Sequence, residues 1–340
     1  MKRSIIIAAF LAVLVSAVPT FAKGSQEQQK AQEKELLVYS IVNEAESKLF
    51  GDLFKEETGI TVNYLRAASG ELVNRIIAEK DAPKADILLG GPASFHIQAA
   101  DKGALATYES PVAAQFPAYA KDPDRHWTGF YVTALGIGVN EKRFKEKFGD
   151  TPLPKTWEDL ANPRFKGEIV VTDPAASSTA YLFVQTQLQR LGWDAGWSYL
   201  EKLAPLVGQF PSSGGAPPQL VGSGEYSLGV AYVHALATYR EKGFPVKLIV
   251  PPQTAGEVGV VSAVKGGPNP DNAKRFIDFV LSQKAQTAFA KESLTVPLNP
   301  AVALPPGAVD VSSIDLIKYD SKLAGDQRDA VLARWQKVVK

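Results

Sequence analysis

The chain has 340 residues, with 37 basic and 36 acidic side chains, three histidines and no cysteine. The balanced charge excludes the strongly basic surface that nucleic acid or an anionic membrane would require. The lack of cysteine excludes disulfides, thiolate metal sites and cysteine nucleophiles. A chain of this length exceeds what one hydrophobic core usually holds, so we expect two lobes.

The first 22 residues have the composition of a cleaved export signal. Lys2 and Arg3 precede an apolar run over residues 5–18, and a small-x-small cleavage site ends at Ala22. The apolar run is shorter than the ~20 residues that a membrane-spanning helix needs. Because no cysteine follows that could carry a lipid anchor, we expect a periplasmic protein whose first residues, 23–35, form a disordered spacer.

From Leu36 onward, short apolar strands alternate with amphipathic helices. Strands are predicted at 37–39, 60–65 and 85–89, and helices at 44–58 and from residue 69. This alternation is typical of parallel βαβ units.

Two long apolar runs, 130–140 and 258–264, bracket a second set of α/β segments. That set comprises residues 165–171, 180–191, 196–204, 227–233 and 248–251. A single helix is predicted over 271–289, a loop over 297–306 and a C-terminal helix over 330–339. Because the long runs flank the second set, we expect them to cross between lobes. The expected division is 36–130 with 258–295 for lobe one, 131–257 for lobe two, and C-terminal segments over 296–340 packed on both.

Seven segments occur in a characteristic order along the chain. They are LLVYS, ASGELVNRI, KADILLGG, GFYVTALGIGVN, NPRFKGEIVVTDPAASSTAY, GSGEYSLGVAY and NAKRFIDFVLSQKAQ. In this order the chain resembles the extracellular solute-binding proteins of ABC importers, and it is most similar to the branch that contains ferric-iron, sugar-phosphate and aminoethylphosphonate binders. The resemblance implies an α/β, two-lobed periplasmic-binding-protein fold (type II-like), in which two crossover strands form a hinge. It also implies a monomer without enzymatic activity or cofactor, whose partners are a small solute and an ABC permease with its ATPase.

In open α/β sheets, ligands bind where strands end and helices begin. The most informative such position is the run Ser177-Ser178-Thr179, because three hydroxyls at a helix start can join free amides and the helix dipole around one oxyanion. One of these hydroxyls could instead only cap the helix. By the same criterion, the other predicted ligand-binding residues are Ser40, Ser69, Gly70, Gly91, Ser213, Gly214 and Tyr232.

Other polar residues are weaker candidates for the same cleft. Tyr232 and His234 are two residues apart on an expected strand, so they would share a face. Arg66, Arg240 and Lys247 are possible counter-charges that the sequence does not separate from ordinary surface residues.

The sequence leaves iron open as an alternative ligand. Ferric-iron members of the branch use adjacent tyrosines at the end of the strand that corresponds to 227–233, whereas Tyr232 is followed here by Val233. An iron site would have to combine Tyr232 with Tyr131. Because Fe³⁺ prefers several anionic oxygens, a cleft of hydroxyls and glycines suits a phosphate ester, phosphonate or carboxylate better. We therefore expect a small organic anion.

An exported hydrolase is the alternative from another functional class. The chain has no GxSxG elbow, no Walker A loop and no HExxH motif. Its histidines, His96, His126 and His234, lack the spacing of zinc ligands. The sequence therefore favours a binding protein, and it does not separate import from receptor signalling.

Overall fold

The computed structural model describes residues 34–339 of the chain. The predicted export signal and most of the predicted spacer lie outside the described residues. Strand β1 (Glu35–Ser40) already includes Glu35, so the fold starts one residue earlier than expected. Within residues 34–339, no helix is both long and apolar enough to cross a bilayer.

The first part of the chain forms the predicted parallel βαβ units. Strand β1 pairs in parallel with β2 (Thr61–Arg66) on one side and with β3 (Ile87–Pro92) on the other. Three helices connect and follow these strands: α2 (Glu44–Thr58), α3 (Ser69–Ala78) and α4 (Ala93–Asp101). Helix α2 has the predicted bounds, because Asn43 caps its start and Gly59, in the left-handed region, ends it.

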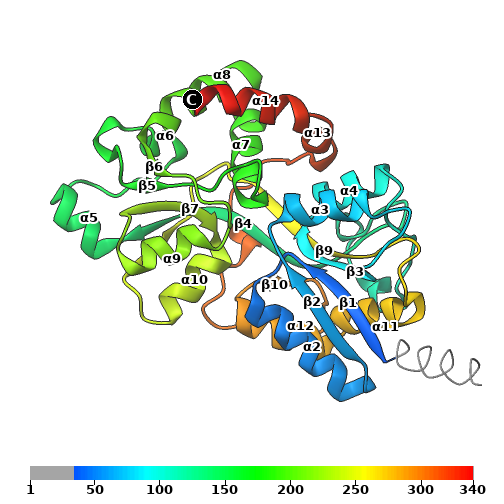
Figure 1. Cartoon of the computed structure of the whole chain (residues 1–340). Helices are drawn as coiled ribbons and strands as arrows, with labels where there is room; N and C mark the ends of the chain where they lie inside the picture. Colours follow the sequence, from blue (N-terminus) through cyan, green and yellow to red (C-terminus); the bar gives the residue numbers. More distant parts are fainter. Residues whose placement is uncertain (1–33, 340) are drawn as a thin grey trace, which may run out of the picture.

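Strand β4 (Thr128–Asn140) passes from one half of the molecule to the other. Up to Ala134 it pairs with β9 (Gly256–Ala263), and from Leu135 it pairs with β7 (Leu228–Tyr232). Strand β9 pairs in turn with β3. We call the half that contains β1 to β3 lobe one and the half that contains β5 to β8 lobe two (Figure 1). The change of partner falls inside β4, after the expected boundary at 130/131.

The remaining elements complete the two lobes. The sheet order is β2-β1-β3-β9-β4-β7-β5-β6, and both β8 and β10 pair with β4. The further strands are β5 (Ile169–Val170), β6 (Val207–Gln209), β8 (Val246–Ile249) and β10 (Val296–Pro297). The helices of lobe two are α5 (Glu141–Phe148), α6 (Trp157–Leu160), α7 (Ser178–Leu191), α8 (Trp193–Leu203), α9 (Ala216–Ser223) and α10 (Val233–Glu241). Short 3-10 helices are η1 (Pro111–Gln115), η2 (Ala118–Ala120), η3 (Pro163–Phe165), η4 (Ala204–Leu206) and η5 (Val311–Ser313).

The prediction of one helix over 271–289 was wrong. The segment forms two helices, α11 (Pro270–Leu281) and α12 (Gln283–Ser293), which are separated by Ser282. Ser282 has extended backbone angles, and its hydroxyl accepts a hydrogen bond from the amide of Ala285. A serine that caps a new helix start in this way breaks a continuous apolar pattern into two elements. Strand β10 also occupies the start of the predicted loop over 297–306.

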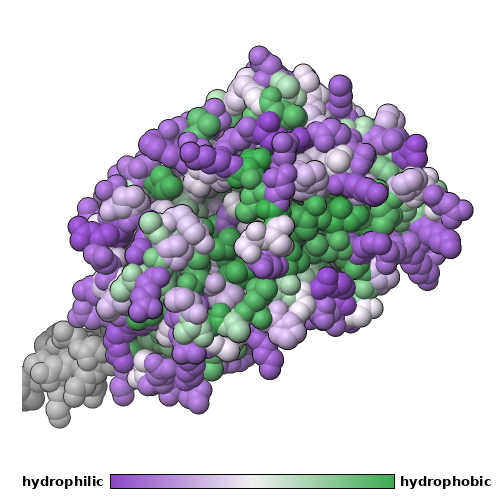
Figure 2. All heavy atoms as spheres, turned by 180° about the vertical axis from the view of Figure 1, so that it is seen from behind, coloured by the Kyte–Doolittle hydropathy of each residue, from purple (hydrophilic) through white to green (hydrophobic). Residues whose placement is uncertain are grey.

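Two C-terminal helices, α13 (Ser321–Asp326) and α14 (Arg328–Val338), lie across the top of the molecule in the view of Figure 1. One apolar cluster contains Leu72 and Phe95 of lobe one, Tyr181 and Trp197 of lobe two, and Trp335 of α14. The two lobes and the C-terminal helices therefore share one continuous core. From behind, hydrophilic side chains cover most of the rim and apolar side chains gather over the middle of the molecule (Figure 2).

Candidate ligand-binding cleft

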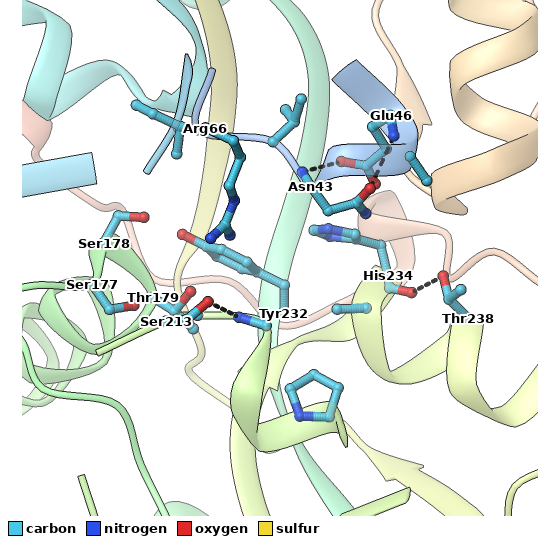
Figure 3. Close-up of a pocket in the computed structure, with 18 of the residues that line it drawn as sticks. Asn43, Glu46, Arg66, Ser177, Ser178, Thr179, Ser213, Tyr232, His234 and Thr238 are labelled. Carbon is cyan, nitrogen blue, oxygen red and sulfur yellow. Dashed lines mark hydrogen bonds between the residues drawn. The ribbon is translucent and has the colours of Figure 1, made fainter. Parts of the chain in front are cut away.

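A cavity of about 340 Å³ lies between the lobes and is lined from both of them. This volume suits a small organic ligand. Most of the predicted ligand-binding residues line it: Ser69, Gly91, Ser177, Ser178, Thr179, Ser213, Gly214 and Tyr232. Tyr131, which was considered only for the iron alternative, lines it as well. Figure 3 shows the hydroxyl side chains of Ser177, Ser178, Thr179 and Ser213 gathered on one side of this cleft.

Several helices begin at the cleft with free backbone amides. Helices α3, α7 and α10 each start at or next to a residue that lines the cavity, and none of the three has a side-chain cap. The first amides of a helix lack intrahelical partners, and the positive end of the dipole adds to them. The arrangement can therefore donate several hydrogen bonds to one anionic group.

The hydroxyl cluster depends on a glycine in the facing loop. A Cβ atom at Gly214 would lie 2.6 Å from Thr179 Oγ1 and 3.2 Å from Ser177 Oγ. Only a residue without a side chain lets this loop approach the hydroxyls so closely. Ser177 holds the N-cap position of α7 and makes no capping bond, so its hydroxyl is not used by the helix.

The lobes meet directly at the side of the cleft that holds the hydroxyl cluster. Ser69 Oγ, from lobe one, donates to Ser178 Oγ of lobe two over 3.0 Å, and both residues are buried. These residues stand at the starts of α3 and α7. The two lobes therefore touch at this point, and both helix starts face the same volume.

Arg66 is the one of the three candidate counter-charges that lines the cleft. Figure 3 shows its side chain reaching from the end of β2 between the hydroxyl cluster and His234. Arg240 instead donates to the carbonyl of Gly307, and Lys247 pairs with Glu141 at 3.4 Å. The sequence could not separate the three cations because the choice depends on which strand end reaches the cleft.

Aromatic residues form the floor of the cleft. The ring of His234 stacks on Tyr232, with centroids 5.5 Å apart, and meets the edge of Tyr131 at 6.0 Å. His234 lies in the first turn of α10 and not on β7, so the expected reason for its position was wrong, although it does line the cavity. Burial lowers the pKa of His234 to about 4, and its Nδ1 lies 2.7 Å from Thr133 Oγ1.

Glu257 of β9 lies beneath the floor. It accepts a hydrogen bond from the Tyr232 hydroxyl, and its Oε2 is buried with no hydrogen-bond partner within residues 34–339. Burial raises the pKa of Glu257 to about 8. Burial also raises the pKa of Tyr232 and of Tyr131 well above the usual range of a phenol. Carboxyl and phenols are therefore held in their neutral forms at neutral pH.

The side of the cleft opposite the hydroxyl cluster carries residues that the sequence analysis missed. Asn43 and Glu46 line it and form a capping box at the start of α2. Burial raises the pKa of Glu46 to about 7, and the negative charge of Glu292 adds to the effect. The capping-box spacing at the end of β1 is the signal that could have selected both residues.

The structure does not place Ser40 or Gly70 in the cleft lining. Ser40, the last residue of β1, is fully buried, and its Oγ lies 2.7 Å from Ser47 Oγ under α2. Gly70 lies one residue into α3 against lobe two, where a Cβ atom would be 3.0 Å from the carbonyl oxygen of Ala175. Side chains alternate along a strand, and that of Ser40 faces α2 and not the cavity.

Among residues 34–339, no group of three or more histidine, aspartate or glutamate side chains could hold a metal ion. The adjacent tyrosine pair that the resemblance associates with iron is replaced in space by Tyr131 and Tyr232, which both lie against His234. Within the described part of the chain, no cationic group lowers the pKa of either phenol.

Comparisons with known proteins give the family of the chain. The family described as bacterial extracellular solute-binding protein matches residues 82–311. The periplasmic binding protein AfuA from Actinobacillus pleuropneumoniae, solved with fructose 6-phosphate bound, is 32% identical and superposes with a TM-score of 0.87 over 90% of this chain and 98% of AfuA. A periplasmic protein of Salmonella typhimurium, provisionally named as 2-aminoethylphosphonate-binding, is 29% identical over 73% of this chain and 72% of its own.

Iron-bound HitA from Pseudomonas aeruginosa has the same fold, with a TM-score of 0.79 over 89% of this chain and 99% of HitA, at 21% identity. At this identity the likeness concerns the fold alone. The predicted branch and the two-lobed α/β architecture are confirmed by these relatives, which are binding proteins. By the family match over more than half of its length, the chain belongs to the bacterial extracellular solute-binding proteins.

Proposed function

We propose that the protein captures a small anionic solute, a phosphate ester, phosphonate or carboxylate, in the periplasm and delivers it to an ABC permease. The observation that carries the proposal is the convergence of the uncapped starts of α3 and α7 with three consecutive hydroxyls on one side of the interlobe cavity. Relatives that bind fructose 6-phosphate and that are named for an aminophosphonate support a phosphorus-containing ligand. The protein acts as a monomer, without catalysis and without a cofactor.

The electrostatics of the cleft fit such a ligand. Arg66 supplies a cation beside the hydroxyls, and the neutral His234 and phenols provide a floor on which the organic part of the ligand can pack. Charge-assisted hydrogen bonds from hydroxyls, amides and a guanidinium are the strongest contacts available to a phosphoryl group. The net charge of the chain is +1, so this attraction is local to the site.

Native mass spectrometry of protein purified from periplasm without refolding tests the proposal. We expect a bound mass that corresponds to a phosphorylated or carboxylated small molecule, since closed binding proteins retain their ligands. Small-angle scattering should give a smaller radius of gyration with this molecule than after its removal, because rotation about β4 and β9 closes the lobes. Retention of a metal ion alone, or equal radii of gyration, would contradict the proposal.

Replacement of Tyr232 by Phe separates an organic anion from iron. For an organic anion, we expect an affinity loss of about 0.5 to 1.5 kcal/mol, up to roughly tenfold, because the Tyr232 hydroxyl already donates its proton to Glu257 and the other donors of the site remain. The wild type should stay colourless in ferric citrate. Calorimetry with the copurified ligand and a visible absorption spectrum measure the two properties.

Tyr226→Phe is the matched control, since Tyr226 lies outside the residues that line the cleft. It should leave affinity and spectrum unchanged. A red or orange wild type whose colour disappears in Tyr232→Phe would show that iron is the ligand.

A further inference from the structure

The C-terminal helix α14 carries an arginine into the seam between the lobes. The guanidinium carbon of Arg328 lies 4.4 Å from the ring centroid of Phe95 and 4.8 Å from that of Tyr181. Phe95 belongs to α4 of lobe one and Tyr181 to α7 of lobe two. The two rings also touch each other edge to face, with centroids 6.4 Å apart. One cation therefore contacts an aromatic ring from each lobe.

The contact between the lobes continues from Arg328 to the side of the cleft that holds the hydroxyl cluster. Tyr181 follows Ser178 by one turn of α7, and Ser178 accepts the interlobe hydrogen bond from Ser69. A Cβ atom at Gly70, next to Ser69 in α3, would lie 3.5 Å from Nη2 of Arg328. Arg328 therefore stands directly behind the two helix starts that face the ligand cavity.

The C-terminal segment touches both lobes on either side of this arginine. Helix α13 packs against α4 of lobe one, and the carbonyl of Ala324 in α13 accepts a hydrogen bond from the Tyr181 hydroxyl. Later in α14, Arg334 bonds to Glu201 and lies over the ring of Trp197, both in α8 of lobe two. The segment thus bridges the lobes at a place separate from strand β4, which also passes between them (Figure 1).

The two ring contacts that stabilise the Arg328 guanidinium are both present only while the lobes are together. Its Nη1 is buried and has no hydrogen-bond partner within residues 34–339. The aromatic faces are the main compensation for its charge, and cation–π attraction strengthens when water is excluded. Separation of the lobes would withdraw one of the two rings and admit water to the seam.

We propose that Arg328 is a positioning residue that fastens the two lobes in the closed form, so that the C-terminal helices act as a latch on the starts of α3 and α7. The inference rests on the lobe closure of the proposed function and not on the identity of the solute. The latch gives the ligand-free protein a closed population, and it preassembles the anion site before a ligand arrives.

Distance measurements between spin labels in the full-length mature protein test the latch without any ligand. The chain has no cysteine, so labels can be placed on Lys80→Cys in lobe one and Lys166→Cys in lobe two, both exposed. In protein freed of bound solute by unfolding and refolding, we expect a closed, short-distance population in the wild type. Arg328→Met should lower this population at least threefold, and Arg328→Lys should lower it less.

Arg334→Met is the matched control, because this arginine lies in the same helix and stacks on an aromatic ring of lobe two only. It should leave the distance distribution unchanged. Phe95→Leu, which removes the ring on the lobe-one side, should reproduce the effect of Arg328→Met and replaces it if that variant does not fold. The latch is refuted by a wild type without a closed population, by an Arg328→Met protein with the wild-type distribution, or by an equal loss in Arg334→Met. Because no solute is present, none of these results depends on whether the ligand is an organic anion.

Discussion

Replacing Ser177, Ser178 and Thr179 together by alanine should weaken solute binding by on the order of 2 to 4 kcal/mol, or about 30-fold to 1,000-fold in Kd. Each hydrogen bond to a charged group contributes ~1.5 to 3 kcal/mol, and neighbouring bonds do not add fully. The three side chains line the cavity, and Ser177 makes no capping bond. The variant should therefore lose affinity while the α7 start remains formed. Titration calorimetry with the copurified solute measures the change.

Thr156→Ala provides the control for the loss of a helix cap. Thr156 caps α6 through a capping box with Asp159, and it lies outside the residues that line the cleft. We expect this variant to lose about 1 kcal/mol of stability and no affinity. If the triple variant folds and binds the solute with wild-type affinity, the hydroxyl cluster is not part of the ligand site.

Much of the fold could be predicted because local signals and tertiary structure agree. Helix α2 has a capping asparagine, an apolar face and a terminal glycine, and its bounds match the prediction. Strand β4 is a long apolar run that could be recognised as a crossover before its pairing was known, since it pairs with β9 in lobe one and with β7 in lobe two. A fold can be predicted from its sequence when local preferences and tertiary packing favour the same structure. The break between α11 and α12 at Ser282 was not predicted, because a serine that caps a new helix does not change the spacing of the apolar residues around it.

The candidate site could be predicted in part, for a similar reason. Ser177, Ser178 and Thr179 are informative because three hydroxyls exceed what one helix cap requires, and the structure places all three at the cavity. Ser40 looked equivalent by its position at a strand end, but the direction of its side chain depends on the pleat and on α2. Arg66 could be separated from Arg240 and Lys247 only by the structure, which shows that Arg66 lines the cleft.

The pairing of Glu257 with Tyr232 could not be predicted from the sequence. The two residues are on different strands, 25 residues apart, and they meet under the floor of the cleft. No local sequence pattern indicates such a contact, because glutamate and tyrosine are also common at exposed strand ends. The contact matters for function because it decides whether the floor is charged.

Stability should therefore depend on pH through Glu257. Burial raises the pKa of Glu257 to about 8, against 4.5 for an ordinary glutamate, so the folded protein keeps a proton that the unfolded chain has lost. Between pH 6.5 and 8.5 the free energy of unfolding therefore falls as the pH rises, and it levels off once the folded state has released the proton above pH 8. Relative to Glu257→Gln, the wild type should lose about 2 kcal/mol over this interval. Urea unfolding of ligand-free protein at several pH values measures the difference.

Glu44→Gln, at an exposed position of α2, should follow the wild-type profile and controls for the loss of a glutamate. The comparison also bears on the ligand. A neutral carboxyl and neutral phenols leave the floor without the anionic oxygens that Fe³⁺ requires, which is the condition for an organic anion bound by hydroxyls and amides. Parallel profiles for wild type and Glu257→Gln would mean that the carboxyl is ionised throughout this pH range. The floor would then be anionic, and the balance between the two ligand classes would shift toward a metal cation.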